Sequence, residues 1–407
     1  MRALSVLHDY EMQSLPAPIQ SYTRLITALF STQSSKGYAQ AWDLFAHMRY
    51  VAHPTPDALL YTLMIRACAL SLTSSSEPER ALDLWTEMTL DHRIPPSTGA
   101  YTAIILACAR SGSKMYIHEA FRLAKEMLDS HRDASGRSAF RPDGKTFSAL
   151  LDGAKRIGDL ARTRWILAEI VRGNDMNEDG GHIDAEVTEE VMMHVFHAYA
   201  AYKPPFKRRT APLVDGKGLT PLGPSMESKL ELQTIAEPLP DDNSRDNLPT
   251  YTVASSFSHL PPQSRSEIIG EAQTLFARIL EDACRDQADD GNRGSQPFSK
   301  VKLTPRLFNS YLSVHYMHAP LEDACNLFKT IFEENGVTRN IRSYVEALER
   351  CSNVKRGRER TVALAFAEEL WVQWQYMEHG MPRENAGRNK ARMIERANVA
   401  MIRIWTL

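Results

Sequence analysis

The sequence predicts an all-α fold, a right-handed solenoid of stacked helix-turn-helix repeats. Three observations predict it. An apolar stripe of fixed spacing recurs along the chain, a second stripe follows each copy of the first, and the pair returns every 36 to 46 residues. Such self-similarity is typical of repeat proteins, in which each unit buries its apolar face by stacking on its neighbours.

The first stripe opens on an aromatic residue, continues with apolar residues at +3 and +4, and has a small residue at +6. Its four clear copies begin at Tyr22, Tyr61, Tyr101 and Phe147. Spacings of three and four place these side chains on one helical face, which predicts the first helix of each repeat, helix A. The small residue lets another helix come close. Cys68 and Cys108 follow it directly, so we expect buried apolar cysteines and not nucleophiles.

The second stripe opens on a small residue and continues with mostly apolar residues at +3, +4 and +7. Its copies begin at Ala41, Ala81, Ala120, Thr163, Ala272, Ala324 and Ala367. This spacing also defines one face of a helix, which predicts a second helix, helix B, in each of about seven repeats. Neither helix can bury its stripe alone.

The repeats divide the chain into five parts. We expect the end of a preceding helix or an N-terminal arm in 1–18, repeats in 19–202 and 263–383, and a basic terminal helix or truncated repeat in 384–407. Between the two sets of repeats, 203–262 holds ten of the chain's 22 prolines, which predicts a disordered insertion inside the fifth repeat. Neither end has a polar capping helix, so we expect the ends to pair elsewhere or the chain to be part of a longer gene product.

Composition excludes several classes of protein. The chain has 48 Lys and Arg against 50 Asp and Glu, a net charge of −2, which rules out a histone-like polycation. Five cysteines without a CxxC motif support neither a zinc ribbon nor a disulfide framework. No apolar run approaches the 18 residues of a membrane span. Asp9 and Glu11 break the acidic-poor pattern of a transit peptide.

One loop matches the calcium-binding pattern of EF-hands. Asp175, Asn177, Asp179, Gly180 and Glu186 stand at the required spacings. However, such sites normally pair and no second copy is present, and acidic Gly-rich loops are common between repeats. We therefore favour a solvated loop without calcium.

His194 and His197 lie three residues apart on a predicted helix and offer a metal-binding alternative, for which no further ligand is evident. We favour a pair on the helix surface. The chain lacks GxSxG, HExxH and Walker motifs, so we expect no enzyme and no cofactor.

The repeat motif is similar to that of a known family. Tyr-x-x-Leu-Ile-x-Ala, then Ala-x-x-Leu-Phe-x-x-Met, then a turn ending in Pro-Asp or Pro-Ser, resembles pentatricopeptide repeats. The instances run from Tyr22 to Asp57, Tyr61 to Ser97 and Tyr101 to Asp143. The long, irregular repeats look more like fungal mitochondrial members, in particular those of small-subunit ribosomal RNA processing and intron splicing. The resemblance implies single-stranded RNA as the partner, one base per repeat, and action in mitochondrial RNA processing, splicing, stability or translation.

The resemblance also implies which residues contact the bases. In this family they are the residue after the helix A aromatic and the last residue of the repeat. The corresponding pairs are Thr23 with Asp57, Thr62 with Ser97, Thr102 with Asp143, and Asn309 with Asn340. Thr with Asp resembles the family's guanine pairing, and Asn with Asn its pyrimidine pairing. The other repeats depart from the pattern, because Met193 and Val345 cannot hydrogen-bond a base. Thr and Ser are also common caps at exposed helix starts.

Local positive charge offers a second route to RNA. Lys355, Arg356 and Arg358 cluster in a predicted turn and can neutralise phosphates. The alternative is a protein-interaction scaffold in a mitochondrial ribosomal or respiratory assembly, which near-neutral charge favours. A third option, an endonuclease, lacks both room for a nuclease domain and an acidic cluster. A basic stripe along the helix A face would favour RNA, and an apolar or acidic face would favour a protein partner.

Overall fold

The structure is all helical. The computed structural model describes residues 2–13, 17–70, 76–129, 140, 142–175, 186–205, 261–286, 297–354, 357–379 and 388–406. These residues form sixteen α-helices and one π-helical turn, and none of them lies in a strand. None of these helices is both long and apolar enough to cross a membrane.

The helices alternate as the two stripes predict. Helix A of the successive repeats is α2 (Ile19–Ser31), α4 (Ala58–Ala69), α6 (Thr98–Ala109), α8 (Gly144–Ile157), α10 (Glu189–Ala201), α12 (Pro305–His318) and α14 (Ile341–Ser352). Helix B is α3 (Ser35–Val51), α5 (Pro78–Thr86) with the π-helical turn η1 (Glu87–Asp91), α7 (Lys114–Asp129), α9 (Leu160–Asp175), α11 (Arg265–Asp286), α13 (Leu321–Glu334) and α15 (Arg358–His379). The helices α1 (Arg2–Met12) and α16 (Arg388–Thr406) flank these seven hairpins.

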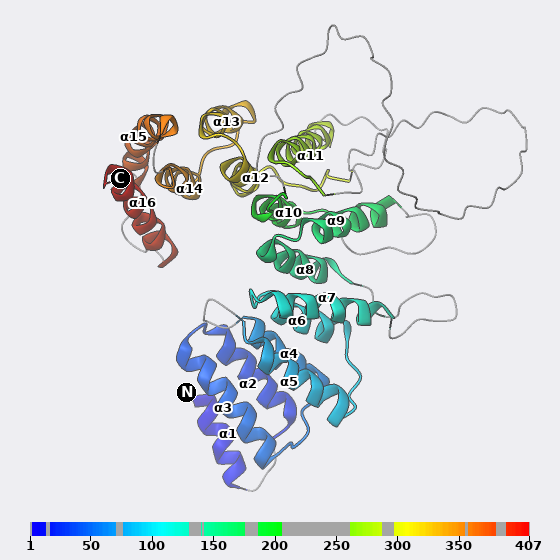
Figure 1. The fold of residues 1–407 in the computed structure, drawn as a ribbon. Helices are drawn as coiled ribbons and strands as arrows, with labels where there is room; N and C mark the ends of the chain where they lie inside the picture. Colours follow the sequence, from blue (N-terminus) through cyan, green and yellow to red (C-terminus); the bar gives the residue numbers. More distant parts are fainter. Residues whose placement is uncertain are drawn as a thin grey trace, which may run out of the picture.

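The hairpins follow one another along an arc. The A helices pack on one another through the middle of the molecule, α4 on α6, α6 on α8, α8 on α10 and α10 on α12. They lie on the inner side of the arc, while α7, α9, α11, α13 and α15 lie on its outer side (Figure 1). The prediction of an all-α solenoid of stacked hairpins is confirmed.

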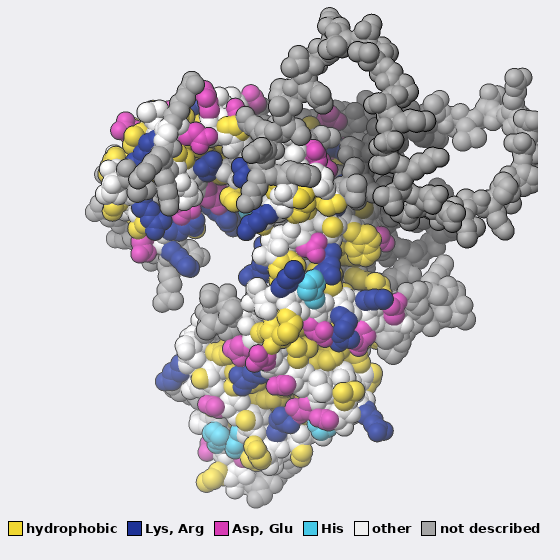
Figure 2. Space-filling model, in the orientation of Figure 1, with side chains coloured by type: hydrophobic (Ala, Val, Ile, Leu, Met, Phe, Trp, Pro, Cys, Tyr) yellow, Lys and Arg dark blue, Asp and Glu magenta, His cyan; other side chains and the backbone are white. Residues whose placement is uncertain are grey.

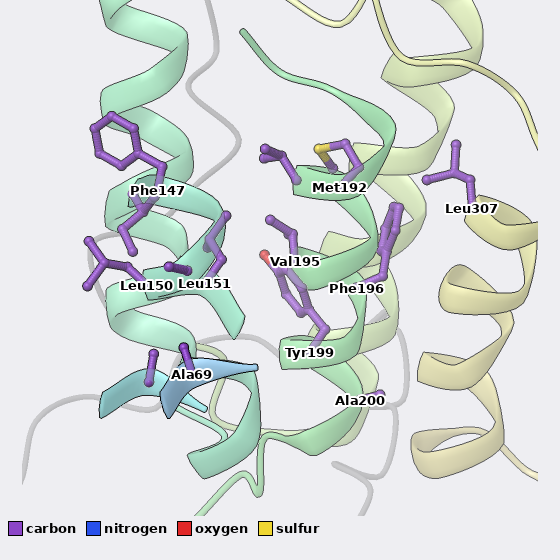
Figure 3. Packing of buried hydrophobic residues seen from close by; sticks show 14 of the residues in the cluster. Ala69, Phe147, Leu150, Leu151, Met192, Val195, Phe196, Tyr199, Ala200 and Leu307 are labelled. Atoms are coloured by element: carbon purple, nitrogen blue, oxygen red, sulfur yellow. The ribbon is translucent and has the colours of Figure 1, made fainter. Parts of the chain in front are cut away.

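Both stripes form the core. The helix B stripe is buried in each repeat, as Ala41, Met48, Ala81, Met88, Ala120, Met127, Thr163, Ile170, Ala272, Ile279, Ala324, Ile331, Ala367 and Trp374 illustrate. Between the A helices, Leu151 of α8 faces Val195 of α10, while Phe196 lies on the side of α10 that faces α12 (Figure 3). Cys68 and Cys108 are fully buried, as expected. Burial raises the pKa of each thiol to about 12, so neither is a nucleophile.

The small residue at +6 is a site of close helix approach. A Cβ on Gly153 of α8 would lie 3.1 Å from the Cβ of Ala109 in α6, the preceding helix A. Ala107 is likewise buried. Ala28 of the first repeat departs from this expectation and is exposed, because within the described chain α2 has no helix A before it to pack against.

Six of the A helices begin with the same device. From α4 onward, the residue before the helix is a small polar one whose side chain accepts a hydrogen bond from the backbone N–H three residues on. These N-cap residues are Asp57, Ser97, Asp143, Thr188, Thr304 and Asn340. Each cap of this kind contributes about 1 kcal/mol. The last residue of a repeat therefore fixes where the next helix A begins.

The two helices of the fifth repeat, α10 and α11, pack together although residues 202–264 separate them in the sequence. Phe276 of α11 stacks on Tyr311 of α12 with ring centroids 4.1 Å apart, and it meets Phe196 of α10 edge-on at 6.1 Å. These contacts join α10 and α11 into one hairpin that packs on the sixth repeat. Most of the predicted insertion, 206–260, and most of the calcium-type loop, 176–185, lie outside the described residues.

Candidate nucleic-acid interface

A groove of about 780 Å³ crosses the inner side of four successive A helices, α4, α6, α8 and α10. Equivalent positions of successive repeats line it, for example Thr62, Thr102 and Ser148, each one residue after the core residue that opens its stripe. Since stacked helices lie about 8–10 Å apart, the groove presents similar polar groups at a regular interval.

The structure brings Thr102 and Asp143 together through a third residue. The Thr146 hydroxyl donates to Asp143 Oδ1 at 2.7 Å and lies 2.8 Å from Thr102 Oγ1. The backbone N–H of Thr146 also donates to Asp143 Oδ1, at 2.8 Å. Both bonds use one carboxylate oxygen, so Oδ2 accepts no hydrogen bond from any described group.

The other two Thr-containing pairs differ in their position relative to the groove. Thr62 and Ser97 flank Gly99, because a Cβ at Gly99 would lie 3.9 Å from Thr62 Cγ2 and 3.7 Å from Ser97 Oγ. Thr23 and Asp57 lie outside the groove lining. The hydroxyls of Thr23 and Thr62 donate to the carbonyls four residues earlier, which leaves their oxygen lone pairs as acceptors.

Asn309 and Asn340 contact each other directly. The Asn309 Nδ2 donates to Asn340 Oδ1 at 3.2 Å, and the Ser343 hydroxyl donates to Asn309 Oδ1 at 2.7 Å. Asn309 is only 3% exposed. A base could reach this amide only if these bonds opened. Of the predicted phosphate-binding cluster, Lys355 and Arg356 lie outside the described residues, and Arg358 begins α15.

Three cationic residues of the groove were not among the predicted contacts. Arg66, Arg110 and Lys145 line it together with the threonines. Arg66 and Lys145 form no ion pair with any described residue. The sequence held a signal for Arg110 alone, which shares with Arg156 the position nine residues after the helix A aromatic. The position of Arg66, five residues after the aromatic, holds Asp152 in the fourth repeat.

A buried carboxylate organises further positive charge beside the groove. Asp152, 8% exposed, lies 2.7 Å from Lys155 Nζ, 3.3 Å from Arg156 Nε and 3.8 Å from Arg110 Nε. Burial raises the pKa of Asp152, but Lys155 and Arg156 outweigh it and hold the pKa below its ordinary value. Three cations around one ionised carboxylate leave a net positive charge. Figure 2 shows Lys and Arg along the inner side of the arc, with Asp and Glu interspersed over its N-terminal half.

The interpretation of His194 and His197 as a surface pair is wrong. The His194 side chain is 12% exposed, and its Nδ1 lies 2.8 Å from Lys155 Nζ. His197 lies against α12, where its Nδ1 is 3.4 Å from Ser313 Oγ. Helix α10 packs between α8 and α12, and these neighbours leave both imidazoles only partly exposed. The ammonium group of Lys155 also disfavours a metal cation here.

Buried histidines make the centre of the solenoid sensitive to acid. The pKa of His194, His197 and His315 is lowered to about 4, mainly by burial, and the charge of Lys155 contributes to the lowering at His194 and His197. The ordinary value is 6.5, so between pH 6.5 and 4 the unfolded chain binds more protons than the folded one. The free energy of unfolding therefore falls as pH falls through this window, by up to about 3 kcal/mol per histidine. We expect a lower urea midpoint at about pH 4.5 than at about pH 7.5.

The variant His197→Asn isolates this contribution from that of the carboxylates, which also titrate in this window. It should flatten the dependence of unfolding free energy on pH. Equal slopes in the wild type and His197→Asn would contradict the assignment.

Comparisons with known proteins show that this chain is similar to others in structure only. No protein-family model matches the chain, and no curated protein matches it. The chain is similar to solved structures of the pentatricopeptide repeat protein PPR10. A variant of PPR10 in complex with an 18-nt psaJ RNA element is 13% identical, with a TM-score of 0.41 over 99% of this chain and 47% of that one. PPR10 from maize is 14% identical, with a TM-score of 0.39 over 99% and 50%. This chain thus spans about half the length of the structures that it matches.

Proposed function

We propose that the chain binds single-stranded RNA along the inner side of the arc, with phosphates on the cations of the A helices and bases on the polar pairs. The main support for this proposal is that several A helices have a cation at the same position of their first turn. Lys145, Arg306 and Arg342 are each the second residue of their helix, in α8, α12 and α14. All three are exposed.

A cation is unfavourable at this position for the helix itself. The first turn of a helix carries partial positive charge, so Lys or Arg there costs about 0.3–1 kcal/mol. The first turns of α8, α12 and α14 contain no acidic residue. Lys145 and Arg306 have no ion-pair partner among the described residues, whereas Arg342 pairs with Glu346 at 2.5 Å. Exposed cations in the first turn of a helix suit an anionic ligand such as a phosphate backbone.

The polar pairs suit the edge of a base. Thr102 and Asp143 present hydroxyl and carboxylate lone pairs, which are acceptors, and guanine offers two neighbouring donors, N1–H and the N2 amino group, on its pairing edge. This supports guanine at the repeat of Thr102. Thr23 with Asp57 carries the same chemistry. The buried Asn309 is the weakest of the proposed contacts.

Asp143→Asn separates capping from base contact. Asn caps helices as well as Asp does, so the free energy of unfolding should change by less than about 1 kcal/mol. The substitution replaces the free Oδ2 acceptor by an amide donor. We expect the preference for guanine at one position of the bound RNA to fall by about 10–100-fold, the discrimination that one bidentate contact provides. Selection of bound sequences from a random RNA pool measures it.

The matched control is Asp159→Asn. Asp159 accepts the backbone N–H of Arg162 at 3.1 Å at the start of helix B of the same repeat, away from the groove lining. It should leave the selected sequences unchanged. The same base preference in Asp143→Asn and wild type would remove Asp143 from the set of base contacts.

The proposal extends to a mitochondrial transcript or ribosomal RNA, which rests on the resemblance alone. Crosslinking of the tagged chain in its own cells, with sequencing of the attached RNA, tests it. A short footprint on one mitochondrial transcript supports the proposal. An RNA from another compartment contradicts the mitochondrial part only.

The second candidate function is a scaffold for a protein partner. The observation that favours it is the mixed charge of the groove, where Asp143, Asp152, Glu186 and Glu190 stand among the cations. Stable co-purifying proteins with no crosslinked RNA above background would favour this function over RNA binding.

A further inference from the structure

Two histidines and a glutamate converge at the N-terminal end of the solenoid, far from the groove lining. The Nδ1 of His8 lies 3.2 Å and the Nε2 of His47 lies 2.9 Å from Glu11 Oε2. The three ligand atoms all lie within 4.8 Å of one another. Within the described ranges of the chain, this is the one group of three or more His, Cys, Asp and Glu side chains with such a spacing. His8 and Glu11 come from one face of α1, and His47 comes from α3.

The second carboxylate oxygen of Glu11, Oε1, is fixed by a hydrogen bond from the core. The Tyr22 hydroxyl of α2 donates to Glu11 Oε1, and Tyr22 is itself fully buried in the core. Glu11 is therefore oriented with Oε2 toward both histidines. Burial raises the pKa of Glu11, but the hydrogen bonds from Tyr22, His47 and His8 outweigh it, so the carboxylate stays ionised. A supporting hydrogen bond of this kind is what orients carboxylate ligands at metal sites.

The cluster is open to solvent on one side. The His8 side chain is 57% exposed and that of His47 38% exposed, while that of Glu11 is only 9% exposed. The two rings meet edge-on with centroids 5.5 Å apart. An ion can therefore enter from solvent, rest on a fixed carboxylate and keep a water molecule in its remaining position.

We propose that His8, Glu11 and His47 bind a zinc ion, or another divalent first-row ion that prefers nitrogen ligands, with water as the fourth ligand. Two imidazoles and one carboxylate are a ligand set that suits Zn²⁺ in tetrahedral geometry. Each neutral ring presents a lone pair at the named nitrogen when its proton sits on the other ring nitrogen. Because only a neutral imidazole can ligate the ion, binding of the ion and protonation of the rings exclude each other. This site is independent of RNA binding.

The ion would fasten α1 to the first repeat. Among the described residues of α1, Leu7 is the one buried core side chain and Leu4 is partly buried against the core, so α1 has little apolar anchorage of its own. A ligand that binds only the folded state stabilises it by mass action. The free energy needed to detach α1 therefore rises with the zinc concentration.

Zinc titration of the chelator-treated full chain tests the proposal. We expect one equivalent of Zn²⁺ to bind in calorimetry, a rise of the melting temperature with added zinc, and a Co²⁺ spectrum typical of tetrahedral coordination. His8→Ala and His47→Ala should each weaken zinc binding by more than about 100-fold, and Tyr22→Phe by about 10-fold, through the supporting hydrogen bond alone. Circular dichroism in the presence of chelator checks that each variant is folded.

His118→Ala is the matched control, because it removes an exposed histidine from α7, outside the cluster. Its zinc affinity should equal that of the wild type. The proposal is overturned if the wild type binds no stoichiometric zinc, or if His47→Ala binds it as tightly as the wild type does.

Discussion

Lys145→Glu with Arg306→Glu is expected to weaken RNA binding by at least about 10-fold at physiological salt, without loss of stability. If each cation neutralises one phosphate of a single strand, removing both lowers the slope of log K against log salt by about 1.4. If wild type and variant bind equally at about 1 M salt, this difference in slope corresponds to an affinity loss of about 10-fold at about 0.15 M salt. The reversed charges add repulsion. Fluorescence anisotropy with a labelled RNA at several salt concentrations measures both quantities.

This double variant separates binding from folding because the two effects have opposite signs. Glutamate in the first turn of a helix is favourable, so the free energy of unfolding should stay equal or rise by about 0.3–1 kcal/mol per site. The matched control is Lys125→Glu with Arg278→Glu, which makes the same change of charge at exposed positions on the B helices α7 and α11. An equal loss of affinity in both double variants would mean that only net charge matters, and no loss in either would exclude the inner face as the phosphate site.

Phe276→Ala should cost about 3–5 kcal/mol of unfolding free energy, as large-to-small changes at buried aromatics do. Phe276 is 4% exposed and contacts rings on two other helices, Phe196 of α10 and Tyr311 of α12. Its removal opens a cavity where the fifth repeat joins the sixth. Because a solenoid is held by nearest-neighbour interfaces, the loss should be concentrated in α10 to α13. Hydrogen exchange of the backbone amides, together with urea unfolding, measures its size and place.

Arg278→Ala provides the comparison on the same helix. Its side chain is exposed, so the change should stay within about 0.5 kcal/mol. Similar small effects for both substitutions would contradict the assignment of α11 as helix B of the fifth repeat. Uniform loss of protection along the whole chain would contradict the nearest-neighbour account.

Periodicity alone was enough to predict the helices and their core. Side chains at spacings of three, four and seven must share one face of a helix, whatever surrounds it. The stripes of Tyr61 and Ala81 are accordingly buried in α4 and α5. The last residue of each repeat was predicted as a base contact or a cap. The structure places each described one from Asp57 onward as a cap, and base contact at these positions stays a prediction.

The candidate interface was predictable only in part. The pair of Thr102 and Asp143 came from the family's pattern of base contacts, and the structure joins the two side chains through the Thr146 hydroxyl. That pattern did not indicate that Asn309 would be enclosed by Asn340 and Ser343, since burial depends on how closely α12 and α14 approach.

The class of fold, the order of the helices and the composition of the core follow from the residue pattern, because these depend on interactions within a few residues and on a repeated motif. Which charges meet depends instead on how the helices pack. Arg110 joins Asp152 from a neighbouring repeat, and His47 joins Glu11 across 36 residues. Electrostatic and metal-ligand contacts act over a few ångströms, so they depend on the packing of helices, which no local pattern of residue types records.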